Sequence, residues 1–308
     1  MLAAYRRTGA DPPGWDVAAD HGSSMEGHFW RLTHAATGRV VVVIAAPCDG
    51  GRWAMVSVGR HPEGTVETHL VDDVRTDRRH LGLRLGDLLE ASPRRLRAPG
   101  LDVELRRPVR WPYAVGGMGA AHVLPGLSQY WSPHTLRADA GDGWRLYGEK
   151  NWAPPGGGMA ATWWWGQAHD FADRDDACVA WAGGPARWGP FAVRGTALAL
   201  ELGGEVVRLV GPPALVHARE FAVSARGARW RVDVEGEPSA TPLGLPVPLP
   251  GERRVLDAYS PQHLAARLRL VVRRGRRVVW RGESRLAGLE DVRPARPGGP
   301  PGAAARPR

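Results

Sequence analysis

The chain has 308 residues, of which 43% are hydrophobic and 24% charged, and it contains 40 Gly, 27 Pro, 14 Trp and 2 Cys. At roughly 150 residues per domain, this length predicts two domains or one large all-β unit, and the composition excludes collagen, coiled coil and wholesale disorder. The longest apolar stretch, residues 40–47, is far shorter than the roughly 20 residues of a membrane-spanning helix. Since the N-terminus also shows no apolar segment typical of a secretory signal, we expect a soluble, cytoplasmic protein.

The net charge of +9 comes from the C-terminal part of the chain. Residues 252–308 contain 14 arginines against 5 acidic residues, which accounts for the whole excess. Nucleic-acid sites interleave aromatic and basic side chains, and among these arginines only Trp280 is an aromatic neighbour, so we expect no nucleic-acid partner. The run from Arg273 to Arg277, centred on Gly275, predicts an exposed hairpin turn. Such a turn either is simply solvated or rests on an anionic membrane as a peripheral contact.

The strand pattern is the main signal for the fold. Short runs of β-branched residues alternate with Gly-rich turns, and stretches with helical periodicity are scarce. This pattern predicts an all-β protein built of antiparallel barrels or sandwiches. The expected hairpins pair 39–46 with 52–59, 196–202 with 205–210, 220–225 with 228–235, and 264–272 with 277–285.

The turn residues Ser132 and Pro133 suggest a domain boundary. We therefore expect one β domain over residues 1–132 and a second over 133–291. The last segment, 292–308, is rich in Pro, Gly, Ala and Arg and has nothing to bury, so we expect a disordered tail there.

The densest group of polar and aromatic residues spans 147–152 and 163–169. If both segments are strands and pair with each other, two-residue alternation places Tyr147, Glu149 and Asn151 on one face, and Trp163, Trp165, Gln167 and His169 on one face of the partner. A buried acid can donate a proton near neutral pH, and indole faces stabilise a nearby cation, so this arrangement favours carbocation chemistry. The alternative is a structural pair of Glu149 with Lys150, the only lysine, and tryptophans that fill a core.

Two further clusters combine polar and aromatic residues. The first is Glu26 with His28 and Trp30, and the second is Tyr130 with Trp131. Each has an alternative in an ordinary strand with a solvated or core side chain. Cys48 and Cys178 are too far apart in sequence to suggest a metal site, and no motif for a metal, a nucleotide or an activated serine is present, so we expect no cofactor.

Residues 149–152, followed by Trp163, Trp165 and Gln167, resemble the signature E-K-N-W-G-x-x-F-P-x-x-W-x-W-x-Q of the tocopherol cyclase family. Residues 25–30 look like the N-terminal strand of that family, and 281–290 are similar to its closing strand. The chain departs from the signature at Ala153, which replaces a glycine, in the missing F-P pair, and in a connecting loop that is three residues longer.

This resemblance implies two lipocalin-like β-barrel halves, a fold shared with carotenoid hydratases, whose W-x-D-x-Q-W element is similar to residues 147–152. Both families protonate an isoprenoid alkene and trap the tertiary cation with oxygen, and neither needs a cofactor. Carried over to this chain, the resemblance makes Glu149 the acid, held by Lys150 and Asn151. Substrate-binding positions are then Glu26, Tyr130, Trp131, Tyr147, Trp152, Trp163, Trp165 and Gln167.

Two functions of different classes follow from these patterns. The first is a cofactor-independent cyclase or isomerase that acts on a prenylated quinol or another isoprenoid. The second is a carrier without catalysis, because an aromatic-lined barrel binds apolar ligands without reacting with them. The position of Glu149 separates the two, since an acid beside an apolar space suits an enzyme and an acid held against Lys150 does not.

Overall fold

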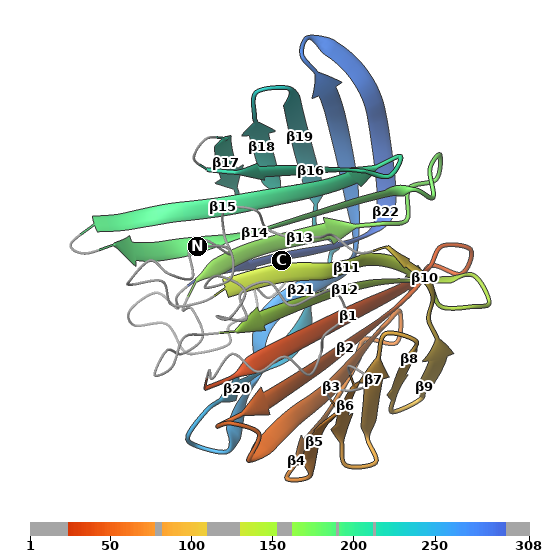
Figure 1. The fold of residues 1–308 in the computed structure, drawn as a ribbon, viewed down its shortest axis with the longest axis vertical. Coiled ribbons are helices and arrows are strands. Elements are labelled where there is room, and N and C mark those ends of the chain that lie inside the picture. Colours follow the sequence, from red (N-terminus) through yellow and green to blue (C-terminus); the bar gives the residue numbers. More distant parts are fainter. Residues whose placement is uncertain are drawn as a thin grey trace.

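The computed structural model describes residues 24–77, 82–109, 130–152, 162–188, 191–211 and 214–293 (Figure 1). In this part of the chain all regular elements are β-strands, no helix is present, and every strand pair is antiparallel. The predicted all-β class is therefore confirmed. The described strands form open sheets packed as a sandwich, and they do not close into a barrel.

The first sheet has seven strands in the order β10-β11-β12-β1-β2-β3-β4. Its strands are β1 (Glu26–His34), β2 (Arg39–Cys48), β3 (Trp53–His61), β4 (Thr65–Val71), β10 (Arg106–Val109), β11 (Tyr130–Asp139) and β12 (Trp144–Trp152). A small sheet follows β4 in five consecutive strands, at the lower right of Figure 1. These are β5 (Val74–Asp77), β6 (Gly82–Leu85), β7 (Leu89–Ser92), β8 (Arg95–Ala98) and β9 (Leu101–Glu104).

The second large sheet has ten strands in the order β16-β15-β14-β13-β22-β21-β19-β18-β17, with β20 paired to β21. Its strands up to β18 are β13 (Trp163–Ala168), β14 (Ala177–Trp188), β15 (Phe191–Leu202), β16 (Glu205–Val210), β17 (Leu215–Arg219) and β18 (Ala222–Arg226). The remaining strands are β19 (Trp230–Glu237), β20 (Leu243–Leu249), β21 (Arg254–Arg274) and β22 (Arg277–Val292).

The four expected hairpins are present as β2–β3, β15–β16, β18–β19 and β21–β22. The turns of β2–β3, β15–β16 and β21–β22 contain glycines with positive φ, for example Gly203 at 61° and Gly275 at 59°. A side chain at such a φ would be strained, so the glycines permit these tight reversals. Turn chemistry and alternation therefore predicted local pairing correctly.

The described residues form four hydrophobic core clusters, three of them large. One lies between the seven-stranded and five-stranded sheets and contains Trp30 and Leu32. A second lies inside the curved ten-stranded sheet and contains Trp164 and Trp181. The third lies between the two large sheets and joins Phe29 and Tyr147 to Trp165. Strands β1 and β13 thus contribute to two cores each, one on either face, which explains why nearly all of their residues are buried.

The change from one large sheet to the other comes late in the chain. The expected boundary between residues 132 and 133 falls inside β11, which pairs with β12 in the seven-stranded sheet. The sheets instead change between β12 and β13, across residues 153–161, which lie outside the described residues. A division into two domains stays a prediction, and the expected tail is outside the described residues from position 294 onwards.

The tip of the β21–β22 hairpin, at the top of Figure 1, is exposed as predicted, except that Arg273 is half-buried and forms an ion pair with Asp233. Residues 274–277 lie in solvent, and next to them Val278 and Val279 are 37% and 40% exposed. The Gly275 amide donates to the Arg229 carbonyl at 2.8 Å, so this turn lies against the β18–β19 turn. Basic and aliphatic side chains therefore share one exposed end of the sheet. No helix in the described part of the chain is long and apolar enough to cross a membrane.

Contact of this tip with anionic lipid stays a prediction. Each arginine near an anionic surface adds up to about 1 kcal/mol, which salt screens. We expect co-sedimentation with phosphatidylserine vesicles to exceed that with phosphatidylcholine vesicles, and to fall in high salt and in Arg276→Ser/Arg277→Ser. The matched control is Arg94→Ser/Arg97→Ser, which removes two exposed arginines of the small sheet. Vesicle binding that does not depend on lipid charge or on salt would contradict the membrane contact and indicate that the turn is simply solvated.

Candidate functional site

The candidate site lies between the two large sheets, where β1 and β12 face β13 and β22. The predicted strands 147–152 and 163–169 both exist, but they do not pair with each other. Strand β12 pairs with β1 and β11, and β13 pairs with β14 and β22. The two segments meet face to face across the sandwich instead, so their side chains converge although their backbones are in different sheets.

Glu149 is the centre of this convergence. Its carboxyl is 5% exposed, and its Oε2 accepts a hydrogen bond from the Tyr147 hydroxyl at 2.5 Å and one from the Trp165 indole at 2.9 Å. Burial, and then the charge of Glu149, raise the pKa of Tyr147 well above 10, so the phenol stays neutral and donates. Both described donors therefore bond to the same carboxyl oxygen of Glu149.

The Trp165 ring is held by close packing. The Phe29 ring packs edge to face against it, with 5.3 Å between the ring centres, and Gly288 of β22 lies against the indole. A Cβ at position 288 would come within 2.8 Å of the ring and 3.0 Å of the Arg31 guanidinium. Only glycine leaves room for both groups, and this fixes the indole against Glu149.

Gln167 and His169 lie deeper along the same face, as the alternation predicted. The Gln167 carboxamide is 2.7 Å from His169 Nδ1, and the Thr33 hydroxyl is 2.9 Å from His169 Nε2. Burial lowers the pKa of His169 to about 3, so the imidazole is neutral at physiological pH. His169 is therefore a neutral hydrogen-bonding group that stacks on Tyr147 at 6.5 Å, and it cannot be the acid.

Lys150 lies away from Glu149. Its ammonium is fully buried and forms an ion pair with Glu26 at 2.5 Å, and it stands opposite His28 in the β1–β12 register. Consecutive residues of a strand point to opposite faces, so Lys150 and Glu26 lie on the other side of the sheet from Glu149. This corrects both the expectation that Lys150 holds the acid and the alternative that Lys150 pairs with Glu149.

The remaining predicted positions are placed only in part. The Asn151 carboxamide lies over Gly27, close enough that a Cβ at position 27 would be 2.4 Å from its oxygen. The backbone register sets Tyr130 opposite Trp152 and Trp131 opposite Asn151, and the side chains of these three aromatic residues are outside what the structure describes.

A second buried carboxyl, that of Glu290, was missed by sequence analysis. It accepts hydrogen bonds from the Trp163 indole at 2.6 Å, from the Ser260 hydroxyl, and from the Gln262 amide at 3.3 Å. Burial raises the pKa of Glu290, while the three donors act in the opposite sense. Trp163 thus bonds to a different acid from Trp165. The only signal in the sequence was an acidic residue directly after the apolar run 286–289.

Arg31 ties the two sheets together and was also missed. Its Nη2 donates to the carbonyls of Leu264 and Leu286 at 2.6 and 2.5 Å, which joins β1 to β21 and β22. Burial lowers the pKa of this arginine to about 10, an effect that the charge of Asp170 partly offsets. Asp170 in turn accepts a bond from the Ser284 hydroxyl at 2.6 Å.

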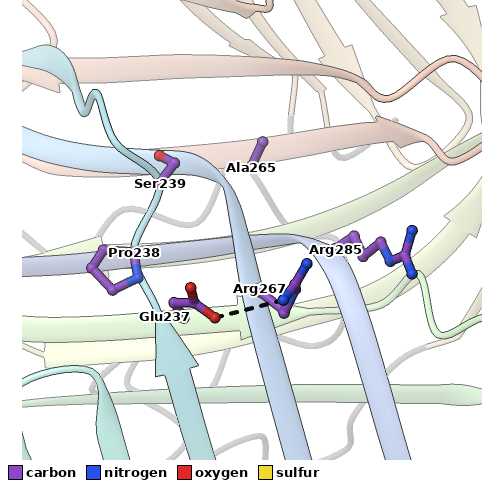
Figure 2. Close-up of a pocket in the computed structure, with 6 residues that line it drawn as sticks. All are labelled: Glu237, Pro238, Ser239, Ala265, Arg267 and Arg285. Carbon is purple, nitrogen blue, oxygen red and sulfur yellow. Dashed lines mark ion pairs between the residues drawn. The ribbon is translucent and has the colours of Figure 1, made fainter.

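A surface pocket of about 210 Å³ lies apart from these groups (Figure 2). Its lining includes the exposed side chains of Arg267 and Arg285, and Figure 2 shows the ion pair of Arg267 with Glu237, at 3.8 Å. Exposed charged groups do not suit the burial of an apolar ligand. Within the described residues no group of three or more His, Cys, Asp or Glu side chains could hold a metal ion.

No protein-family model matches the chain, and no curated protein matches it in sequence. Solved structures do match it in fold. A structure of CghA with Sch210972 is 11% identical in sequence and has a TM-score of 0.59, and the match covers 92% of this chain and 93% of CghA. A second CghA structure matches over the same shares of both chains, with a TM-score of 0.54. A kievitone hydratase from Nectria haematococca is 11% identical over 91% of this chain and 93% of its own, with a TM-score of 0.47.

The chain shares the fold of CghA. At this identity the likeness shows the architecture alone, so any chemistry must be argued from the side chains of this protein. None of the structures named here is a tocopherol cyclase, and the resemblance to that family stays a prediction.

The buried Glu26–Lys150 pair leads to a stability prediction. Glu26→Gln removes the charged partner of a fully buried ammonium, and breaking such a pair costs about 3–5 kcal/mol. We expect urea unfolding to show that loss, and Glu26→Gln/Lys150→Met to recover much of it, because both charges of the pair are then removed together. The control, Glu67→Gln, removes an exposed partner of Arg60 and should cost below about 1 kcal/mol. A loss in Glu26→Gln no larger than the control would contradict this account.

Proposed function

We propose that the protein is a cofactor-independent enzyme of the tocopherol cyclase type, which cyclises a prenylated quinol by protonating its alkene. The observation that carries the proposal is the Glu149 carboxyl, buried between two sheets and bonded to Tyr147 and Trp165. A positioned acid beside an indole, in a site that excludes water, is what alkene protonation requires. The shared fold is compatible with a small-molecule ligand, since one CghA structure was solved with Sch210972.

The reaction balances without an oxidant or reductant. Glu149 gives its carboxyl proton to one alkene carbon, and the positive charge develops on the adjacent tertiary carbon. A phenolic oxygen of the same substrate forms a C–O bond to that carbon, and its proton returns to the carboxylate. The product is an isomer of the substrate, and Glu149 is restored.

The neighbours of Glu149 suit the two charges that form during this step. Tyr147 and Trp165 already donate to Oε2, so the carboxylate left after proton transfer keeps two hydrogen bonds that need no rearrangement. The Trp165 ring is held in place by Phe29 and Gly288, and an indole face near a cation is worth about 0.5–2 kcal/mol. Neutral His169 cannot repel the cation.

Glu149→Gln tests the proposal directly. The amide keeps the shape of the side chain but has no acidic proton, so turnover of a prenylated hydroquinone should fall by about 100-fold or more with affinity little changed. The control, Glu283→Gln, changes an exposed glutamate of β22 and should leave turnover intact.

Turnover, ligand affinity and melting temperature are measured on the same preparation. Full turnover in a folded Glu149→Gln protein would remove Glu149 as the acid. Tight binding of the hydroquinone with no turnover in the unmodified protein would instead identify a carrier of isoprenoid ligands.

A further inference from the structure

We infer that the Glu290 cluster binds a hydrogen-bond donor of the ligand, which for a quinol is the hydroxyl that does not take part in ring closure. The inference rests on the proposed function for the identity of the ligand, and it assigns the orientation of that ligand. The cluster consists of Glu290 of β22, Ser260 and Gln262 of β21, and Trp163 of β13.

The cluster is built as an acceptor. Ser260 and Trp163 each donate their single polar hydrogen to the carboxyl of Glu290, and Gln262 donates one of its two amide N–H groups. Besides the second N–H of Gln262, the cluster offers acceptor lone pairs on the carboxyl and on the Gln262 amide oxygen. A carboxylate has about four acceptor positions, so three donors leave room for one more. The chemical class that fits is a hydroxyl or another N–H or O–H donor.

Gln262 provides the second, independent observation. Its side chain is 2% exposed, and its nitrogen bonds to Glu290, which turns the amide oxygen away from that carboxyl. In the described part of the chain this buried oxygen has no hydrogen-bond partner. A buried acceptor without a partner destabilises the protein, so a ligand hydroxyl that bonds to this oxygen recovers the missing hydrogen bond.

The strand register places this cluster beside the proposed acid. Glu290 stands opposite Trp165 in the β13–β22 ladder, and the Trp165 indole reaches Glu149. Trp163 precedes Trp165 by two residues on the same face, a spacing of about 7 Å along a strand. One ligand that spans this spacing can therefore place a ring hydroxyl at Glu290 and its prenyl alkene at Glu149.

The aromatic surroundings suit a ring at this position. Trp163 is only partly buried and stacks on Tyr259 of β21, with ring centres 5.9 Å apart and planes inclined by 29°. The pair offers flat apolar surface beside the carboxyl, which is the usual composition of a site for a hydroxylated aromatic ring. A long isoprenoid chain without a ring makes no use of Glu290 or Gln262.

The test compares two ligands. One is a prenylated hydroquinone, and the other is the same compound methylated at the hydroxyl that does not react. Their dissociation constants are measured anaerobically by tryptophan fluorescence. We expect the full-length protein to bind the free hydroquinone about 10-fold more tightly or better, because the ether leaves buried acceptors unpaired.

Gln262→Leu and Glu290→Gln should each bring the two dissociation constants closer, to within about 3-fold for Gln262→Leu. Glu283→Gln, an exposed change on β22, should keep the full ratio.

Equal affinity of the unmodified protein for the two compounds, or a ratio that both variants retain, overturns the inference. Because the first comparison needs no variant, it decides the matter even if a substitution prevents folding. The proposed function fails separately: a preserved ligand ratio without turnover keeps the hydroxyl site and removes the cyclase. Turnover together with equal dissociation constants for the two compounds would keep the cyclase and remove the hydroxyl site.

Discussion

The hydrogen bond from the Trp165 indole to Glu149 crosses the space between the two large sheets, and the arrangement of the site depends on such contacts. Within each sheet the backbone groups satisfy one another, so only side chains can join one sheet to the next. Arg31 adds a further polar connection by donating to two carbonyls of the opposite sheet, and the Thr33 hydroxyl bonds to His169. Apolar side chains such as Phe29 and Leu264 pack together in the core between these sheets.

Local features of this structure could be predicted from the sequence, and pairings between distant strands could not. Two-residue alternation correctly placed Tyr147 with Glu149, and Gln167 with His169, since it depends only on neighbouring residues. It says nothing about which strand lies beside which. One partner of β12 is β1, more than a hundred residues earlier, and this pairing brings the side chain of Lys150 to Glu26. Glu290 was missed for the same reason, because its donors come from β13 and β21.

The two buried carboxyls give the space between the sheets an unusual character. An all-aromatic core would bind an apolar chain without any chemical consequence. Here Glu149 and Glu290 are each bonded to an indole N–H, from tryptophans two residues apart on β13. Buried acids are costly and are retained where they have partners or a task. Since the chain shares with CghA only the fold, these side chains are the basis for the proposed function and for its specificity.

The central claim is that the protein protonates an alkene, and the fate of solvent hydrogen tests it most directly. A prenylated hydroquinone is incubated with the protein in D₂O, and the product is analysed by mass spectrometry after exchange of its hydroxyl groups back into H₂O. The account predicts a cyclised isomer that keeps one deuterium on carbon, next to the new C–O bond. A cyclised product without deuterium, or recovery of the unchanged hydroquinone, would contradict it.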